Sequence, residues 1–300
     1  MNKADIIGKQ IKYLRNQAQI TQSELADGIG TQAQISRIES GDVIPLCTTL
    51  YEIAYKLGVD VNYFYNQAYY PRYDYVTEIK YQIRKAIRER NYKEVEHLIQ
   101  TEEGHLAFKM PSNHQFILWH KGIIEYYLRK DVNKSFTLLE TAFMIGKGKN
   151  NTLPTSIQDI EILNSQAIIF NEISDYNQSF KIYKTALNHL KNMPEIPDKR
   201  VVIRLYYGIA KSLFKLKIFE ESISYCDKGI KLCLKEELLY LLGELHYESG
   251  QNYQALNNYF KSLDHYSRAK ELFYLSKKES FFEVTKEKIF QIKNIMKNDK

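Results

Sequence analysis

Residues Thr21–Gly41, with the sequence TQSELADGIGTQAQISRIESG, decide the fold of the N-terminal part of this 300-residue chain. They predict two short helices joined by a tight turn. The first helix is expected over about residues 22–29, because Thr21 is suited to cap its first turn. Glu24, three residues further on, completes a capping box with that threonine.

The second helix is expected over about residues 32–40, with Thr31 as its cap and Gly41 as a left-handed stop. Each helix has one apolar face, formed by Leu25, Ala26 and Ile29 in the first and by Ile35 and Ile38 in the second. The residues left facing outward are short, polar and neutral or basic: Gln32, Ala33, Gln34, Ser36 and Arg37. Such side chains suit the base edges of a DNA major groove.

The strings TQSELA and SRIESG within residues 5–65 resemble the helix-turn-helix of phage repressors and of Xre-type transcription regulators. In that class the second helix of the motif is the recognition helix. The resemblance implies that Gln22 binds a DNA phosphate and that Arg37 prefers guanine. The full predicted DNA-binding set is Gln22, Thr31, Gln32, Ala33, Gln34, Ser36 and Arg37. An ordinary helical hairpin is the alternative, but it leaves the polar outer face unexplained.

Three more helices are expected around this pair, completing a five-helix domain over residues 1–66. The first, over residues 5–17, should bury Ile7, Ile11 and Leu14 and leave Lys9, Lys12 and Arg15 outside, in reach of phosphate. The others are expected over residues 48–57 and 61–65. The segment 66–74, NQAYYPRYD, predicts a break at Pro71, so residues 67–90 are interpreted as a linker and linker helix.

Composition favours an all-α chain, because only 13 residues are Gly and 6 are Pro. The net charge is +6, which is compatible with nucleic-acid binding. The segment 1–66, however, contains six Lys or Arg and seven Asp or Glu, a net charge of −1. One copy of this domain should therefore hold DNA weakly through charge alone.

The chain beyond residue 90 contains degenerate repeats. Five segments align on a small or β-branched residue that is followed four positions later by a large one: Val95, Ser135, Ser179, Ser222 and Ala255. The steps are unequal, and the last one, from Ser222 to Ala255, is the shortest. The pattern is similar to tetratricopeptide (TPR) repeats and predicts a right-handed TPR-like α-solenoid over residues 91–300, with capping helices at about 268–297. A helical bundle without repeats is the alternative.

In a TPR solenoid the first helix of each pair lines a concave groove that commonly holds an extended peptide. With the aligned residue set as repeat position 20, the predicted groove residues are His120, Tyr127, Asn164, Asn171, Arg204, Tyr207, Lys211, Tyr240, Glu244 and Tyr247. Asn side chains can pair with a peptide backbone, and Arg or Lys can bind a carboxylate.

The order of parts, the chain length and the strings SRIESG, RNYKEV and FEES resemble the RRNPP quorum-sensing regulators of Gram-positive bacteria, especially their PlcR-like branch. This resemblance implies a cytoplasmic homodimer that binds a palindromic double-stranded DNA operator and is switched by a short signalling peptide. It also implies that Arg88 and Arg90 hold the acidic or carboxylate end of the peptide and that Asn164 binds its backbone. Gly208 stands where the family places a second such Asn.

Two other functions remain open: a phage-type repressor whose C-terminal domain only dimerises, and a TPR interaction scaffold. No enzyme activity, cofactor or metal site is expected, because GxxxxGK[ST], HExxH and GxSxG motifs are absent. The three cysteines, Cys47, Cys226 and Cys233, form no CxxC motif. With no signal peptide or long apolar run, the sequence predicts a reduced cytoplasmic protein without membrane contact.

Overall fold

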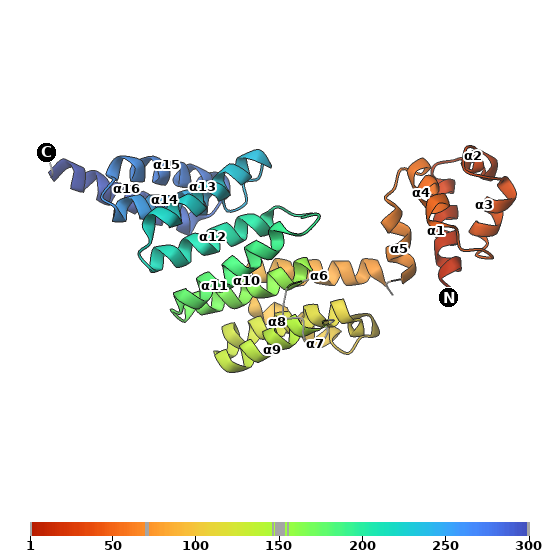
Figure 1. Cartoon of the computed structure of the whole chain (residues 1–300), viewed down its shortest axis with the longest axis horizontal. Helices are drawn as coiled ribbons and strands as arrows, with labels where there is room; N and C mark the ends of the chain where they lie inside the picture. The colour runs from red at the N-terminus through yellow and green to blue at the C-terminus, as the bar shows by residue number, and fades with distance from the viewer. Residues whose placement is uncertain (1, 70–71, 146, 148–153, 155, 299–300) are drawn as a thin grey trace. The chain divides into compact units, whose positions relative to one another are not determined.

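The computed structural model describes residues 2–69, 72–145, 147, 154 and 156–298. Within these residues every regular element is a helix, and no strand occurs (Figure 1). The predicted all-α fold, a helix-turn-helix domain followed by TPR-like repeats, is confirmed. The chain divides into two compact units, Met1–Ile117 and Leu118–Lys300, and each is described by itself.

Five helices open the first unit: α1 (Lys3–Gln17), α2 (Gln22–Ala26), α3 (Gln32–Glu39), α4 (Cys47–Lys56) and α5 (Val61–Tyr69). The predicted caps are present. The Glu24 N–H donates to the Thr21 hydroxyl oxygen, and the Thr21 N–H donates to the Glu24 carboxylate at 2.6 Å. The Gln34 N–H donates to Thr31 Oγ at 3.2 Å, and Gly41 follows α3 with a φ of +82°.

One hydrophobic core holds these five helices together. Its buried side chains come from every helix and include Ile7, Ile11, Leu25, Ile35, Ile38, Leu50, Ile53 and Phe64. Full burial of one such side chain contributes about 1.5–3 kcal/mol. The packing of Ile35 and Ile38 therefore fixes which face of α3 remains for solvent.

Two boundaries differ from the prediction. α2 ends at Ala26 and does not reach Ile29, because the chain turns at Gly28, whose φ of +75° is incompatible with a right-handed helix. Both α5 and α6 extend into the predicted break at residues 66–74. Pro71, on which that prediction rested, lies outside the described residues.

The remaining elements form helical pairs. They are α6 (Tyr73–Arg88), α7 (Tyr92–Glu102), a 3-10 helix (Leu106–Lys109), α8 (Pro111–Arg129), α9 (Val132–Met144), α10 (Ile157–Glu172), α11 (Tyr176–Lys191), α12 (Arg200–Lys215), α13 (Phe219–Lys235), α14 (Leu242–Ala255), α15 (Tyr259–Leu275) and α16 (Glu279–Asn298). From α9 to α16 each helix packs on the next, and α12 also contacts α10 and α14. This is the contact pattern of a helical-repeat solenoid, in which α10, α12 and α14 form the inner layer.

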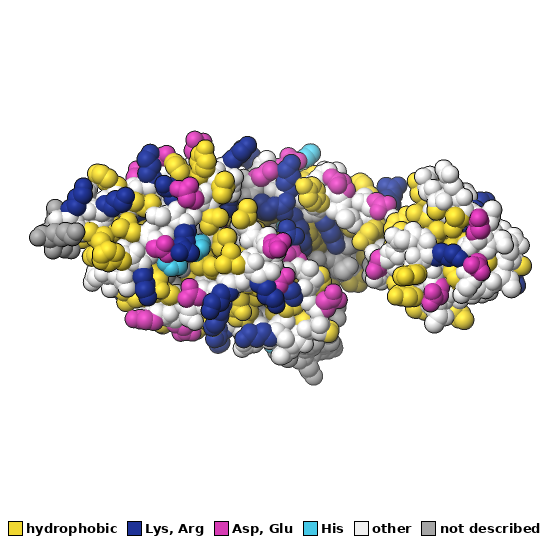
Figure 2. Space-filling model, turned by 90° about the horizontal axis from the view of Figure 1, so that it is seen from above, with side chains coloured by type: hydrophobic (Ala, Val, Ile, Leu, Met, Phe, Trp, Pro, Cys, Tyr) yellow, Lys and Arg dark blue, Asp and Glu magenta, His cyan; other side chains and the backbone are white. Residues whose placement is uncertain are grey.

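The exposed surface is mixed in character. On the face drawn in Figure 2, Lys and Arg side chains lie among acidic and hydrophobic ones and do not form one broad basic surface. This agrees with the modest net charge of +6. Contacts with a charged partner must therefore come from local groups of side chains.

A serine hydroxyl joins the two helices of successive pairs. The bonds run from Oγ to a main-chain carbonyl of the preceding helix: Ser135 to Gly122 at 2.7 Å, and Ser179 to Ala167, Ser222 to Ala210 and Ser262 to Gly250 at 2.8 Å each. All four serines are fully buried. Small residues on both sides let the backbones approach to hydrogen-bond distance, which explains the small residues of the repeat pattern.

The register predicted for the last repeat is wrong. Ala255, which the alignment paired with the serines, is the last residue of α14, and Ser262 occupies the equivalent place. The second helices start after the N-caps Asn91, Asp131, Asp175, Ile218 and Asn258, and the last step between these caps is as long as the first. The string NYQA resembles a helix start, but Asn252 lies inside α14, where its amide donates to Ser222 Oγ at 2.9 Å.

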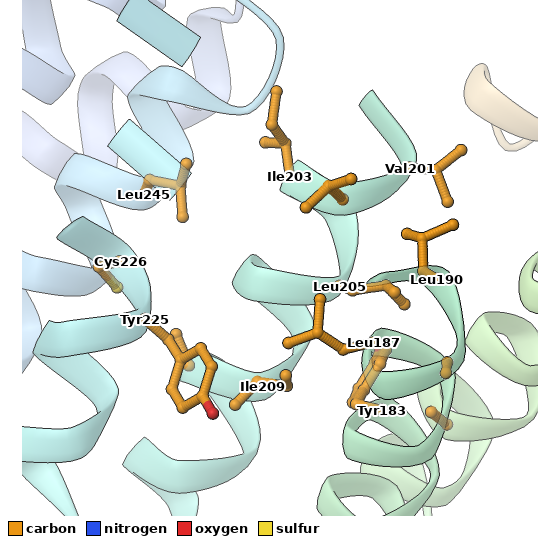
Figure 3. Close-up of a cluster of buried hydrophobic side chains, with 14 of the residues drawn as sticks. Tyr183, Leu187, Leu190, Val201, Ile203, Leu205, Ile209, Tyr225, Cys226 and Leu245 are labelled. Carbon is orange, nitrogen blue, oxygen red and sulfur yellow. The ribbon is translucent and has the colours of Figure 1, made fainter. Parts of the chain in front are cut away.

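Tyr183 of α11 occupies the space beside Gly208 of α12. Figure 3 shows the core around it, where Leu187, Leu205 and Ile209 gather between the two helices. A Cβ atom on Gly208 would overlap the Tyr183 ring. The tyrosine therefore explains why an Asn, which the family resemblance led us to expect at this position, is replaced by glycine.

Gly208→Ala should destabilise the chain by about 1–3 kcal/mol, because the added methyl group overpacks a closed core. Thermal unfolding of the full chain would show this as a drop in Tm of several degrees. Gly104→Ala is the matched control, since no atom lies within 4 Å of its added Cβ. Equal Tm values for the two variants would contradict the packing described here.

Candidate DNA interface and ligand groove

The outer face of α3 carries the predicted base-reading residues. Gln32, Ala33, Gln34 and Arg37 are exposed, as is the cap Thr31, and Ser36 is half-buried. On the opposite face Ile35 and Ile38 are each only 1% exposed. The helix is thus held by its apolar side while its polar side remains available; contact of these residues with DNA stays a prediction.

A chain of polar contacts connects α1 to the start of α3. Glu39 lies at its centre and accepts hydrogen bonds from Arg15 Nε at 2.6 Å and from Gln22 Nε2 at 2.9 Å. Gln22 Oε1 in turn accepts a hydrogen bond from Gln32 Nε2 at 2.7 Å. The network sets the rotamers of two residues that we predicted to contact DNA, Gln22 and Gln32.

The prediction that Arg15 lies outside and reaches phosphate is wrong. Its side chain is 11% exposed, and the Glu39 side chain it binds is 2% exposed. Arg15 also donates to the Ile20 carbonyl at 2.8 Å. A buried carboxylate needs a cation and donors close by, and Arg15 supplies them. Lys9 and Lys12 are exposed, as predicted.

The electrostatics of Glu39 follow from these contacts. Burial raises the pKa of its carboxyl, but hydrogen bonds from Arg15 and Gln22 outweigh burial and hold the pKa below its usual value. Glu39 is therefore ionised at neutral pH. Gln22 keeps one amide hydrogen that the network does not use, so its predicted phosphate contact is compatible with the structure.

The inner layer of the second unit carries most of the predicted peptide-binding residues. Two of them are asparagines with different surroundings. Asn164 of α10 is 5% exposed, and its Oδ1 has no hydrogen-bond partner within the described residues. Asn171 donates from Nδ2 to Ser212 Oγ at 3.0 Å. Asn164 thus retains an unused acceptor, whereas Asn171 is partly engaged.

Three charged groove residues, Glu161, Arg204 and Glu244, form ion pairs. Arg204 of α12 forms an ion pair with Glu161 of α10 and donates from Nε to the Tyr240 hydroxyl at 3.0 Å. Glu244 of α14 pairs with Lys278, just before α16. These pairs tie neighbouring helices together across the inner layer.

The remaining predicted residues differ in access. Lys211 lies 5.6 Å from the Tyr207 ring, and Tyr247 packs on Tyr266 with ring centroids 5.3 Å apart. On α8, Tyr127 donates to Glu172 Oε1 at 2.7 Å. His120 is 1% exposed and packs 4.3 Å from the Trp119 ring, so the structure buries a residue that we predicted to line the groove.

The corrected register changes the groove set in the last pair. Glu244 and Tyr247 remain at groove positions, Tyr240 falls in the turn before α14, and Gln251 and Gln254 take the later positions. The register also puts Glu161 on the groove, a residue that the sequence prediction did not name. The available signal was its place in the repeat, since Glu161 precedes Ser179 by the same interval as Arg204 precedes Ser222.

Arg88 and Arg90 belong to the first unit. Arg88 ends α6, and Arg90 follows the helix with a φ of +57°; both are exposed. Their role in holding a peptide end stays a prediction.

Other kinds of site find little support in the described residues. No group of three or more His, Cys, Asp or Glu side chains there is arranged to hold a metal ion. Cys47, Cys226 and Cys233 are free thiols, the last two buried. None of the helices described is long and apolar enough to cross a membrane.

Two family models match the chain. Residues 11–64 match a helix-turn-helix family, and residues 80–291 match the RNPP family C-terminal domain. No curated protein sequence matches it. The fold and its exposed polar α3 define a helix-turn-helix transcription regulator with a helical-repeat domain. The chain belongs to the RNPP family of regulators, and it is not an enzyme.

Solved structures with the same fold cover nearly the whole chain. Bacillus thuringiensis PlcR, in complex with the peptide PapR7 and DNA, is 24% identical with a TM-score of 0.84, over 94% of this chain and 99% of PlcR. S. thermophilus ComR, in complex with DNA and its signalling peptide ComS, is 17% identical with a TM-score of 0.65, over 95% of this chain and 99% of ComR. Streptococcus dysgalactiae Rgg2, an SHP pheromone receptor, is 18% identical with a TM-score of 0.65, over 95% of this chain and 99% of Rgg2.

Glu39→Gln should loosen α1 and α3, because it replaces a buried charge-assisted pair with a weaker neutral bond. We expect the opening free energy of amides in both helices to fall by about 1–3 kcal/mol, measured by hydrogen exchange near pH 7. The wild-type advantage is present above about pH 4.5 and disappears as pH falls through the lowered pKa of Glu39.

Glu52→Gln is the matched control for this variant, since Glu52 is an exposed carboxylate of the same domain. Unchanged protection in both variants would show that the Glu39 network does not hold α3 in place.

Proposed function

We propose that the protein binds a palindromic double-stranded DNA operator as a homodimer and that a short signalling peptide in its repeat groove controls this binding. The observation that supports DNA binding is the polar outer face of α3. Core packing orients this helix on one side, and the Glu39 network holds its two ends. The peptide half is supported by family membership and by the inner layer of α10, α12 and α14.

DNA recognition is assigned to residues 1–66. The residues that would read bases are Gln32, Ala33, Ser36 and Arg37. Thr31 and Gln34 would lie at the edge of the DNA major groove, and Gln22 would bind phosphate. Because this domain has a net charge of −1, one copy holds DNA weakly. Two copies with recognition helices about 34 Å apart, one DNA turn, would supply the missing affinity.

Peptide binding is assigned to the repeats of residues 91–300, preceded by the linker region 67–90. The solved complexes of PlcR with PapR7 and DNA and of ComR with ComS and DNA show both ligand classes on proteins of this fold. Asn164 has the free acceptor that a peptide N–H requires. A regulator acting on DNA in this way works in the cytoplasm, and the peptide shifts the dimer between states that space the two recognition helices differently.

The test of control by peptide uses protein purified from its own cells. Native mass spectrometry would identify any peptide it carries, and operator binding would be compared with and without that peptide. A different operator affinity supports the proposal. Equal affinity in both conditions would contradict control by peptide and favour the alternative function, a repressor whose repeat domain only dimerises.

Arg37→Ala should weaken operator binding by about 1–3 kcal/mol and relax the base preference at one position of each half-site. Selection of binding sites from a random DNA pool at fixed salt measures both effects. Lys12→Ala is the contrasting control: Lys12 is exposed and proposed to contact phosphate, so its loss should lower affinity equally for all sequences and reduce the salt dependence. Uniform loss in the Arg37 variant would instead make Arg37 a phosphate contact.

A further inference from the structure

Glu248 of α14 is a buried acid with an unbonded carboxylate oxygen. The residue is 4% exposed, and its Oε1 has no hydrogen-bond partner within the described residues. Leaving a buried carboxylate oxygen unbonded costs free energy that the fold must recover elsewhere. The other acids of the inner layer have partners: Glu161 pairs with Arg204, Glu244 with Lys278 and Asp159 with Lys147, and Glu172 accepts a hydrogen bond from Tyr127. Glu248 is therefore the exception in this layer.

Two lysines lie on α12, the helix of the inner layer that packs on α14. Lys211 and Lys215, one helical turn apart and both exposed, exert a charge effect on Glu248, and neither forms an ion pair with any described carboxylate. With Glu248 ionised, the three side chains carry a net charge of +1, and with Glu248 protonated they carry +2. In both states the group keeps an excess of positive charge.

The group lies at the groove. Lys211 stacks 5.6 Å from Tyr207, and both occupy groove positions of the repeat register. Burial, and then the charge of Glu248, raises the pKa of Tyr207, so the acid acts electrostatically on a groove residue. Glu248 directly follows Tyr247, a groove residue of α14.

We propose that Lys211, Lys215 and Glu248 form a subsite for a carboxylate group of the peptide, either its C-terminus or an acidic side chain. The two ammonium groups neutralise the ligand carboxylate, and Glu248 binds one proton from solvent and donates it in a hydrogen bond to that carboxylate. Two carboxylates at hydrogen-bond distance cannot both stay ionised, so they share a proton. This subsite rests on the proposed peptide-binding function.

The pH dependence of binding follows from Glu248. Burial raises the pKa of its carboxyl to about 7, against the opposing effect of Lys211 and Lys215. A ligand carboxylate raises this pKa further, so binding takes up a proton and weakens as pH rises above 7. Each pH unit above the free pKa lowers the affinity up to about tenfold.

The tyrosines, the cysteine and the histidine around Glu248 do not change charge between pH 6.5 and 8.5. Besides the two lysines, Tyr207, Cys226 and Tyr266 face it from neighbouring helices, and Glu244 and Tyr247 lie on α14 itself. Burial is the main cause that raises the pKa of the three tyrosines and of Cys226. His246, on the same helix, has a pKa lowered to about 4, mainly by burial.

The experiment exposes the full-length protein to two pools of synthetic heptapeptides of random sequence without Asp or Glu, one with free and one with amidated C-termini. A third pool is amidated but contains one Asp. Peptides retained at pH 6.5 and pH 8.5 are quantified by mass spectrometry. We expect retention of carboxylate-bearing peptides only, falling about tenfold or more from pH 6.5 to 8.5.

Three variants sharpen the result. Glu248→Gln keeps a hydrogen-bond donor without a titrating group, so retention should become independent of pH. The double variant Lys211→Met and Lys215→Met should lose retention, whereas Lys231→Met, an exposed lysine of α13, should not. Thermal unfolding checks that each variant is folded.

The outcomes separate the two proposals. If carboxylate-free peptides are retained as well as the others, or if wild-type retention does not change with pH, the subsite is wrong and peptide binding stands. Preference for cationic peptides at pH 8.5 would show that ionised Glu248 binds a cation instead. If no peptide from any pool is retained, peptide binding fails and the subsite fails with it.

Discussion

The cost of burying a carboxylate organises both parts of this protein. An acid removed from water requires a cation or several donors within hydrogen-bond distance, so each buried acid imposes a fixed contact on the helices around it. Glu39 holds Arg15 of α1 and Gln22 of α2, and so positions the recognition helix. Glu161 and Glu244 bind Arg204 and Lys278, which connects α10 to α12 and α14 to the start of α16. At Glu248 one buried carboxylate oxygen has no such partner, and we propose that a ligand supplies it.

The solenoid depends on a second constraint, the close approach of paired backbones. A serine hydroxyl that reaches a carbonyl of the preceding helix is possible only where both helices carry small residues. The same contact recurs within successive helical pairs, and α12 also packs on both α10 and α14. A regular layer presents groove residues at equivalent heights, which is the geometry an extended ligand needs. The repeat thus links a packing requirement directly to the surface proposed for peptide binding.

Local chemistry explains which features were predictable. Helix starts at Thr21 and Thr31 and the stop at Gly41 depend on residues within three positions of one another, so they follow from sequence alone. The inward placement of Ile35 and Ile38 follows from helical periodicity. The predicted register of the last repeat was wrong because NYQA has the sequence of a helix start. Asn252 instead lies inside α14 and donates to Ser222, and this partner lies 30 residues away in the sequence. The prediction that Arg15 is exposed failed for the same reason, since its partner Glu39 is 24 residues away.

The sequence by itself determined that the chain is all-helical, that a helix-turn-helix precedes TPR-like repeats, and which face of α3 points outward. These properties depend on short-range periodicity and capping, and each is visible within one or two helical turns. Only the tertiary structure decided which charged residues are available. Arg15 and Arg204 are engaged by acids from other helices, His120 is buried beside Trp119, and neither Lys211 nor Lys215 forms an ion pair with a described carboxylate. Charge pairing and burial depend on which distant helices meet, and that is fixed only when the core is packed.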